Sequence, residues 1–363
     1  MKVGIVGLPN VGKSTLFNCL SQSKAQSENY PFCTIEPNVS IVNVPDIRLE
    51  KLREIVQPEK LIPTTVKIVD IAGLVKGASK GEGLGNKFLS NIRETDAIIH
   101  VLRCFDDPNV VHVDGKINPL SDKEVVEYEL ILKDLEVIEK RLDKIKKTLR
   151  SGSNETKKEI DTLERVKISL ENATINKNDF SEDEFHEFIK PLELISFKPI
   201  LYVCNVGESD VLNGNEHVEK VKQLVKGNDV KVIIISAKIE SEINELDSEE
   251  EKRMFLEDLG LDESGSNKLI RASYKLLNLH SYFTAGKQEV RGWTIRVGDT
   301  AYDAAGQIHT DFQKGFICAE VINYNDFLEY GSEVKVKEAG KMRLEGKDYI
   351  VSDGDIMHFR FNI

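Results

Sequence analysis

The sequence predicts an α/β fold in which helices cover a doubly wound, mostly parallel sheet. An apolar run at residues 3–6 is followed by G-x-x-x-x-G-K-S at 7–14 and then by a helix-like segment. Further strand-like runs alternate with helical segments and lie at 66–70, 97–103, 199–205 and 230–236. This alternation is typical of a parallel sheet, whose ligands bind beyond the carboxyl ends of the strands.

The G-x-x-x-x-G-K-S segment has the composition of a phosphate-binding loop. Its glycines allow successive backbone N–H groups to turn toward the β- and γ-phosphates of a nucleotide, Lys13 supplies a positive charge, and Ser14 supplies a hydroxyl ligand for Mg²⁺. The helix that follows directs its amino end at the same anion. An ordinary glycine turn would leave Lys13 unexplained, so we expect a nucleotide here.

Two further segments have the character of nucleotide-dependent switches. Thr34 lies in a proline-bracketed segment at 30–37 and is placed to close on Mg²⁺ and the γ-phosphate. Asp70 begins the sequence D-x-x-G, where it would hold the magnesium shell while the Gly73 amide senses the γ-phosphate. The glycine-rich stretch at 77–85 would allow a loop to reorder when that phosphate is lost. Taken singly, an ordinary loop threonine and a flexible surface loop are the alternatives.

The group that orients the attacking water is not evident from these motifs. Leu74 stands where related hydrolases have a glutamine, so hydrolysis by the isolated protein should be slow. His112 is a candidate for the missing polar group, although a lone loop histidine is more often only solvated. Asn10 is a candidate ligand for a K⁺ ion that would neutralise charge between the β- and γ-phosphates.

The residues after the strand at 199–205 have the form of a nucleobase-recognition motif. In an N-K-x-D site, the aspartate accepts hydrogen bonds from N1–H and the N2 amine of guanine. Here Val206 replaces the lysine and Glu208 is one methylene longer than aspartate, so ATP should bind more tightly than GTP. The adenine N6 amine would donate to a backbone carbonyl, for which Val206 is the best-placed candidate. A relaxed site that accepts both nucleotides is the alternative.

A helical insertion separates the strands at 97–103 and 199–205, because almost a hundred residues lie where one helix is usual. Its first helix carries a heptad seam formed by Tyr128, Ile131, Leu135, Ile138, Leu142, Ile145 and Leu149. After a break at 151–155, a returning helix is marked by Ile160, Leu163, Val166 and Leu170. We therefore expect a short antiparallel coiled-coil arm.

The tip of this arm carries the densest basic cluster of the chain, formed by Lys140, Arg141, Lys144, Lys146, Lys147, Arg150, Lys157 and Lys158. A solvated helical surface is the simpler interpretation of such a cluster. The chain has a net charge of −12, so any contact with nucleic acid would have to come from a local patch of this kind.

Composition is typical of a globular cytoplasmic protein. The 363 residues, 40% of them hydrophobic, can form a large core and two or three domains. The five cysteines are widely separated and have no metal-binding spacing, as expected of reduced thiols. We find neither a signal-peptide pattern nor a run of 18 apolar residues, so we expect a cytoplasmic protein that does not enter a membrane.

From residue 280 the pattern changes to short strands and turns, which indicates a separate small α+β domain. We expect a nucleotide-binding domain formed by residues 1–120 and 197–279. The helical insertion at 121–196 interrupts it, and the C-terminal domain occupies 280–363.

With these motifs in order, the sequence resembles the YchF / Obg-like ATPase family over its whole length. The most specific segments are those at 30–38, 70–85, 282–286 and 308–312. The resemblance implies a P-loop NTPase domain of the Obg type with a G-domain-like fold, a helical insertion, and a C-terminal TGS domain with the β-grasp fold of ubiquitin. It also implies ATP in preference to GTP, Mg²⁺ as cofactor, and association with ribosomal particles.

Carried over by position, the family's motifs assign roles to residues of this sequence. The phosphates would be held by Asn10, Val11, Gly12, Lys13, Ser14 and Thr15. The ligands of Mg²⁺ would be Ser14 and Thr34, with Asp70 in the metal shell. The base would lie among Asn205, Val206, Glu208, Ser236, Ala237 and Lys238. The candidate catalytic groups are Lys13, Thr34, Gly73 and His112.

Two classes of function follow from these expectations. One is an ATP-hydrolysing switch that acts on ribosomes and regulates translation or a stress response. The other is a nucleotide-dependent binding module with negligible hydrolysis, in which the arm and the C-terminal domain contact ribosomes or RNA. A GTPase or a dual-specificity switch is a variant of the first class.

Overall fold

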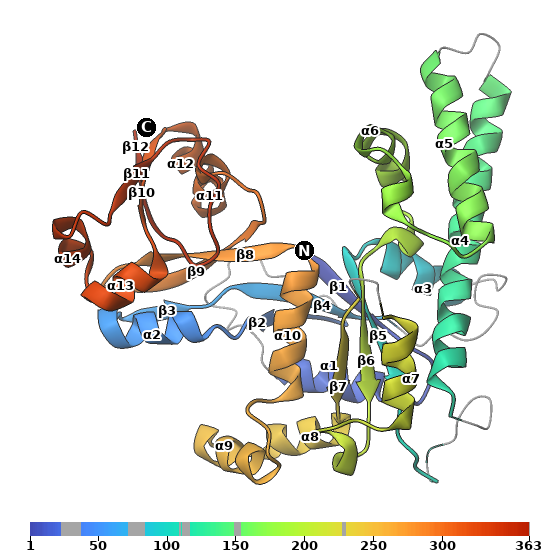
Figure 1. The fold of residues 1–363 in the computed structure, drawn as a ribbon, viewed down its shortest axis with the longest axis horizontal. Coiled ribbons are helices and arrows are strands. Elements are labelled where there is room, and N and C mark those ends of the chain that lie inside the picture. The colour runs from blue at the N-terminus through green and yellow to red at the C-terminus, as the bar shows by residue number, and fades with distance from the viewer. Residues whose placement is uncertain are drawn as a thin grey trace. The chain divides into compact units, whose positions relative to one another are not determined.

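The computed structural model describes residues 1–22, 38–71, 84–108, 110, 117–148, 154–226 and 230–362. The chain divides into two compact units. The first comprises residues 1–19 and 68–266, and the second comprises residues 20–67 and 267–363. Figure 1 shows the helices and strands of both units.

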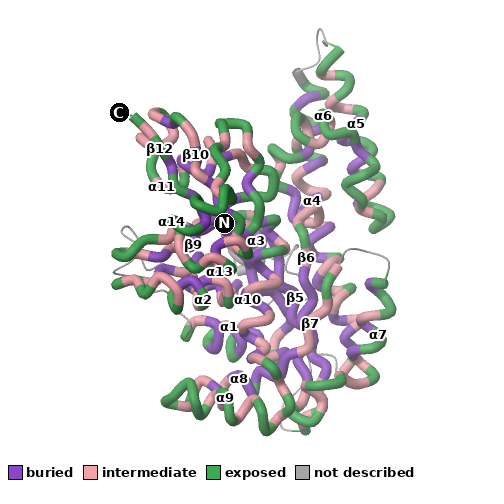
Figure 2. Tube along the Cα trace, turned by 60° about the vertical axis from the view of Figure 1, so that its left-hand side comes forward, coloured by how far each residue is buried: buried purple, intermediate pink, exposed green. Residues whose placement is uncertain are grey.

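The sheet that carries the phosphate-binding loop has the strand order β2-β4-β1-β5-β6-β7. Its strands are β1 (Lys2–Val6), β2 (Val39–Asn43), β4 (Thr65–Asp70), β5 (Ala97–Arg103), β6 (Ile200–Asn205) and β7 (Val232–Ile235). The pairs β1–β5, β5–β6 and β6–β7 are parallel. Every residue of β5 is buried, and Figure 2 shows this strand in the interior. The predicted doubly wound parallel sheet is therefore confirmed.

Helices follow most of these strands, as the alternating pattern predicted. They are α1 (Lys13–Gln22), α3 (Leu84–Arg93), α7 (Glu216–Leu224), α8 (Ala237–Glu245), α9 (Glu249–Asp258) and α10 (Gly265–Leu276). Helix α7 illustrates why they form where they do. The Asn215 side chain accepts a hydrogen bond from the Val218 N–H and so caps its amino end. Val218 and Val221 then bury one face of α7 in a cluster with Tyr202 and Cys204 of β6.

The helical insertion forms the expected antiparallel arm, in which α4 (Pro119–Thr148) and α5 (Asn154–Glu171) lie side by side (Figure 1). Its core contains the predicted residues Ile131, Ile138, Leu142, Ile145, Leu163, Val166 and Leu170. Leu135 and Ile160 pack against this core while partly buried. Short helical turns at 177–197 complete the insertion, among them α6 (Glu182–Glu184).

The prediction of the seam was wrong for one residue, Tyr128. Tyr128 is 61% exposed, whereas its neighbours Val126 and Leu130 are buried. The first turns of α4 lie against the sheet, where Leu120 packs with Leu102 and Cys104 and the Tyr202 hydroxyl donates to Glu127. The buried face there is therefore set by the sheet and not by α5. Leu149 and Arg150 lie outside the described residues.

The second unit contains a mixed sheet with the strand order β11-β10-β12-β8-β9-β3. Its strands are β3 (Lys60–Ile62), β8 (Leu279–Ala285), β9 (Glu289–Arg296), β10 (Phe316–Ile322), β11 (Arg343–Glu345) and β12 (Ile356–Phe361). The β8–β9 and β10–β12 pairs are antiparallel, whereas β12–β8 and β3–β9 are parallel. The C-terminal α+β domain predicted from the short strands is thus confirmed.

Helices cover this second sheet on both faces because the strand residues alternate. Tyr282 packs in a cluster with Ala304 of α11 (Ala301–Ile308), whereas Phe283 packs in a cluster with Leu52 and Phe327. The remaining helices are α2 (Ile47–Val56), α12 (Thr310–Lys314), α13 (Tyr324–Tyr330) and α14 (Glu333–Glu338).

The boundaries that we expected for the domains stay a prediction. The compact units group residues 20–67 with the C-terminal residues, although β2 and β4 belong to the nucleotide-binding sheet. The physical reason is that β3 adds to the sheet beside β9, and α2 buries Leu49 and Leu52 against Phe283 and Val290. Among the described residues, no helix combines the length and apolar character needed to cross a membrane.

Candidate nucleotide-binding site

The phosphate-binding loop connects the end of β1 to the start of α1, as predicted. Asn10 and Gly12 both have left-handed backbone conformations, with φ of 62° and 90°. A Cβ atom at Gly12 would come within 2.2 Å of the Asn205 Nδ2 atom. Glycine is therefore favoured by the dihedral angle, and a Cβ atom would also collide with the Asn205 side chain, which belongs to β6.

Lys13 and Asp70 meet at the floor of the site. The Lys13 ammonium forms an ion pair with the Asp70 carboxylate, and only 7% of Lys13 is exposed. Asp70 is the last residue of β4, whereas Lys13 is the first residue of α1. The structure thus brings together the two charged groups that separate motifs predicted for phosphate and Mg²⁺.

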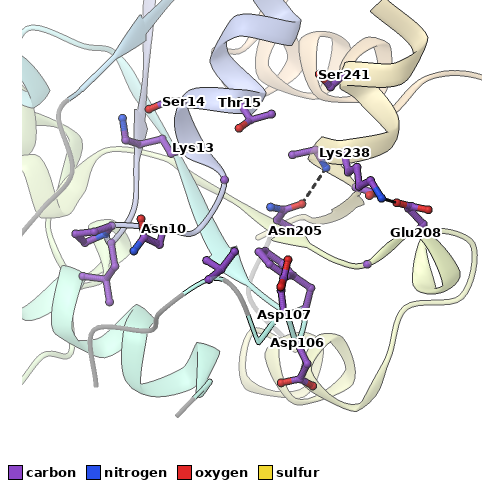
Figure 3. Close-up of a pocket in the computed structure, with 18 of the residues that line it drawn as sticks. Asn10, Lys13, Ser14, Thr15, Asp106, Asp107, Asn205, Glu208, Lys238 and Ser241 are labelled. Carbon is purple, nitrogen blue, oxygen red and sulfur yellow. Dashed lines mark hydrogen bonds and ion pairs between the residues drawn. The ribbon is translucent and has the colours of Figure 1, made fainter. Parts of the chain in front are cut away.

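Asn205 connects the phosphate-binding loop to the segment that begins α8. Its Nδ2 atom donates to the Val11 carbonyl at 2.9 Å, and its Oδ1 atom accepts from the Ala237 N–H at 2.9 Å. Both polar ends of this buried side chain are therefore used inside the protein. The contact fixes the loop relative to the segment after β7, which contains Ser236 and Lys238 (Figure 3).

A cavity of about 980 Å³ lies above these contacts. Its lining includes the predicted residues Asn10, Gly12, Lys13, Ser14, Thr15, Asp70, Asn205, Glu208, Ser236, Ala237 and Lys238. Val11 and Val206 are instead buried beneath it, and the Val206 side chain packs in the cluster of Val218 and Val221. The Val206 N–H donates to the Ile235 carbonyl, which holds β6 to β7 at this edge of the sheet.

Three predicted residues lie outside the described part of the chain: Thr34, Gly73 and His112. Their assigned roles remain predictions.

The cavity also includes residues that we did not predict. The segment after β5 contributes Phe105, Asp106, Asp107 and Val110, and further lining comes from Leu8, Pro9, Gly207 and Ser241. Figure 3 shows Asp106 and Asp107 on the side of the pocket that also holds Asn205. Their position directly after a buried parallel strand was a usable signal, because ligands bind beyond the carboxyl ends of such strands.

A buried arginine positions this segment. Arg103, 1% exposed, donates to the carbonyls of Phe105 at 3.2 Å, Asp107 at 3.3 Å and Val110 at 3.0 Å. Its guanidinium also lies 4.6 Å from the centre of the Phe105 ring. Burying a guanidinium is costly unless its N–H groups are satisfied, so these carbonyls and Arg103 hold one another in a defined arrangement.

The donor set fits Mg²⁺ in the form that phosphate-transfer sites use. The Ser14 hydroxyl and the Asp70 carboxylate line the same cavity. Both are hard oxygen donors, and Mg²⁺ in such sites takes one or two protein oxygens while phosphates and water supply the rest.

A parallel sheet with a phosphate-binding loop, a D-x-x-G strand end and an N-x-x-E strand end defines the class of P-loop nucleotide hydrolases. Two family models agree with this class. One, described as "50S ribosome-binding GTPase", matches residues 2–165. The other, for the C-terminal domain of YchF GTPases and described as "Protein of unknown function (DUF933)", matches residues 279–362.

The chain belongs to the YchF family. It is 53% identical to the ribosome-binding ATPase YchF of Bacillus subtilis, with all of both chains covered. It is 52% identical to the protein of the same name from Escherichia coli O157:H7, with 100% of this chain and 99% of that protein covered. A solved structure of the Schizosaccharomyces pombe YchF GTPase is 39% identical, has a TM-score of 0.89, and covers 99% of this chain and 97% of that one.

Proposed function

We propose that this chain is an ATP-hydrolysing molecular switch that associates with ribosomes in the cytoplasm. The observation that carries the proposal is the convergence of Lys13, Ser14, Asp70 and Asn205 on one cavity large enough for a nucleoside triphosphate. Its relatives named ribosome-binding ATPase YchF, similar over the full length, support both the reaction and the partner.

In this proposal, binding of MgATP separates the Lys13–Asp70 ion pair, and each of the two residues gains a new charge-assisted contact. Lys13, now paired with Asp70, would contact the β- and γ-phosphates, and Asp70 would hold the shell of Mg²⁺, for which Ser14 and Thr34 would supply hydroxyl groups. The ion supplies charge neutralisation at the phosphates. Backbone N–H groups of residues 10–15 and the amino end of α1 hold the same phosphates. The Gly73 amide would bind the γ-phosphate, so loss of that phosphate would release the glycine-rich segment that follows.

Chemistry in the isolated protein is slow in this proposal because Leu74 cannot orient a water molecule by hydrogen bonding. Asn10 is positioned in the pocket and is our candidate ligand for an activating K⁺ ion. His112 is our second candidate for the missing polar group. Replacing K⁺ by Na⁺ should lower the rate if Asn10 has this role, and His112→Ala should lower it if the histidine does.

Turnover measurements test the reaction and the partner together. Purified protein is given MgATP or MgGTP, with and without ribosomal particles. We expect ATP to be hydrolysed in preference to GTP and ribosomes to accelerate the reaction. Equal turnover of both nucleotides would contradict adenine selectivity, and a rate unaffected by ribosomes would favour a nucleotide-dependent binding module.

The ribosome contact is proposed for the arm tip and the C-terminal TGS domain. Residues 140–148 and 154–160 contain seven lysines and arginines against three acidic residues. Several of the cations are already paired across the arm: Arg141 contacts Glu159 at 2.5 Å, and Lys146 contacts Glu164 at 2.8 Å. Within the described residues, Lys147, Lys157 and Lys158 form no such ion pair. These three are therefore the best candidates for contact with the phosphates of ribosomal RNA.

Charge reversal tests this contact. A variant with Lys147→Glu, Lys157→Glu and Lys158→Glu should co-sediment with ribosomes about tenfold more weakly and show a shallower dependence on salt. The matched control reverses Lys220, Lys222 and Lys226, which lie in and directly after α7. ATP affinity should be unchanged in both. Equal co-sedimentation of the two variants would leave the C-terminal domain as the contact.

A further inference from the structure

The base end of the cavity has few groups that remain available to read guanine. The Ala237 N–H is engaged by Asn205 Oδ1 at 2.9 Å, and Asn205 Nδ2 is engaged by the Val11 carbonyl at 2.9 Å. Glu208 is the remaining member of the N-x-x-E sequence that lines the cavity and carries a hydrogen-bonding side chain. Its availability therefore determines whether guanine can be recognised.

Glu208 is engaged by Lys238. Glu208 begins the short 3-10 turn after β6, and Lys238 is the second residue of α8, so the ion pair spans two elements at the cavity rim (Figure 3). Lys238 is 71% exposed and Glu208 46% exposed at the side chain, and ion pairs this exposed contribute little to stability. The contact matters because it engages the Glu208 carboxylate, which lines the cavity.

Ser236 provides a second, independent observation. Its side chain lines the same cavity and is 1% exposed, yet its Oγ atom has no hydrogen-bond partner within the described residues. A buried hydroxyl without a partner is costly, so a ligand group that satisfies it gains affinity. A base that reaches this hydroxyl would satisfy it.

We propose that Lys238 is a specificity-determining residue that disfavours guanine by holding the Glu208 carboxylate away from the base. The proposal rests on the proposed ATPase function and deepens it. Guanine presents N1–H and an N2 amine that need acceptors, and leaving them unmet lowers its affinity. Adenine has no N–H at N1, and its N6 amine can donate to a backbone carbonyl, so the withdrawal of Glu208 lowers its affinity less. The Ser236 hydroxyl can both donate and accept, so it can serve either base, and the discrimination against guanine rests on Glu208.

Competition binding with four proteins tests the proposal. A fluorescent ATP analogue is displaced by unlabelled ATP or GTP from the wild type, Lys238→Met, Glu208→Gln and the double variant. We expect Lys238→Met to raise the affinity for GTP relative to ATP about fivefold or more, because the freed Glu208 then accepts from guanine. Glu208→Gln alone should change this ratio less than about twofold, and the double variant should lose the gain.

Two outcomes would overturn the inference: an unchanged ratio in Lys238→Met, or the same change in the double variant, which would mean that Glu208 takes no part. Lys220→Met is the matched control, because Lys220 also forms a surface ion pair, with Glu216, but does not line the cavity. Failure of the wild type to bind ATP would instead contradict the proposed function. A wild type that binds ATP while Lys238→Met leaves the ratio unchanged would remove only the role of Lys238.

Discussion

In the nucleotide-binding cavity, single buried polar side chains hold separate segments together, whereas in the arm this task is shared by a repeated apolar seam. Lys13 forms an ion pair with Asp70, and Asn205 joins the phosphate-binding loop to the first residue of α8. The arm instead buries many aliphatic residues between α4 and α5 and adds ion pairs outside them. Single substitutions in the cavity should therefore strongly reduce nucleotide binding or hydrolysis. Substitutions in the arm should reduce its stability in proportion to the buried surface that they remove.

The contrast follows from what each region has to do. Binding a triphosphate requires charges and N–H groups at fixed positions, so each group has a defined role. An arm that presents charged residues to a large partner needs only to remain extended, which a heptad seam achieves with interchangeable apolar contacts. The following predictions test this contrast, beginning with the largest effect.

Lys13→Met should reduce ATP hydrolysis about a thousandfold, because the charge that stabilises the β- and γ-phosphates in the transition state is lost. Single-turnover hydrolysis under saturating MgATP measures the effect. Lys220→Met, which removes a lysine outside the cavity, should retain the wild-type rate. A loss of less than tenfold in Lys13→Met would mean that the cavity does not depend on single groups.

Ile138→Ala should destabilise the arm by about 3 kcal/mol, because Ile138 is fully buried in the seam and its truncation leaves a cavity. Amide hydrogen exchange in α4 and α5 measures the local loss, and the affinity for ATP should change less than twofold. Ile168→Ala is the control on the same arm, since Ile168 is 57% exposed. A comparable loss of ATP affinity would show that the two regions are not independent.

In the interior of the sheet, the free energy of unfolding also depends on a single buried group, His100. Complete burial, together with the nearby Lys123 charge, lowers the pKa of His100 from 6.5 to about 3. Between these values the unfolded chain binds a proton that the folded chain does not, so the free energy of unfolding falls as the pH falls from 6.5 toward 3. At pH 5 this costs about 2 kcal/mol.

The variant His100→Phe isolates this effect, because His100 Nε2 has no hydrogen-bond partner within the described residues and its removal breaks no bond at that atom. Urea unfolding at pH 7 and pH 5 should give a difference in stability about 2 kcal/mol smaller in the variant than in the wild type. An unchanged difference would show that other groups carry the acid sensitivity.

Arg141→Met should have the smallest effect, about 0.5 kcal/mol on arm stability, because the Arg141–Glu159 pair is partly exposed. Hydrogen exchange in α5, compared with that of Ile138→Ala, measures it. A loss as large as that of Ile138→Ala would mean that ion pairs, and not the seam, hold the arm together.

The sequence motifs predicted the site residues that lie close together in the chain. The spacing from Gly7 to Ser14 already fixes a phosphate-binding loop, and the strand before it and the helix after it confirm the setting. The arm was equally predictable, because an apolar repeat of 3.5 residues indicates which side chains face the partner helix even before that helix is identified. Tyr128 shows the limit of this reasoning, since it is exposed while the adjacent Glu127 contacts Tyr202 of the sheet.

The sequence by itself determined the parallel sheet, the class of ligand and the antiparallel arm, because each is encoded by residues close together in the chain. Only the tertiary structure revealed that Arg103 positions the segment after β5, that Lys238 engages Glu208, and that β3 joins β9. These contacts join segments whose relative positions depend on how the whole chain packs. A local pattern contains no information about such a partner, and the free energy that selects it comes from burying the surrounding residues together.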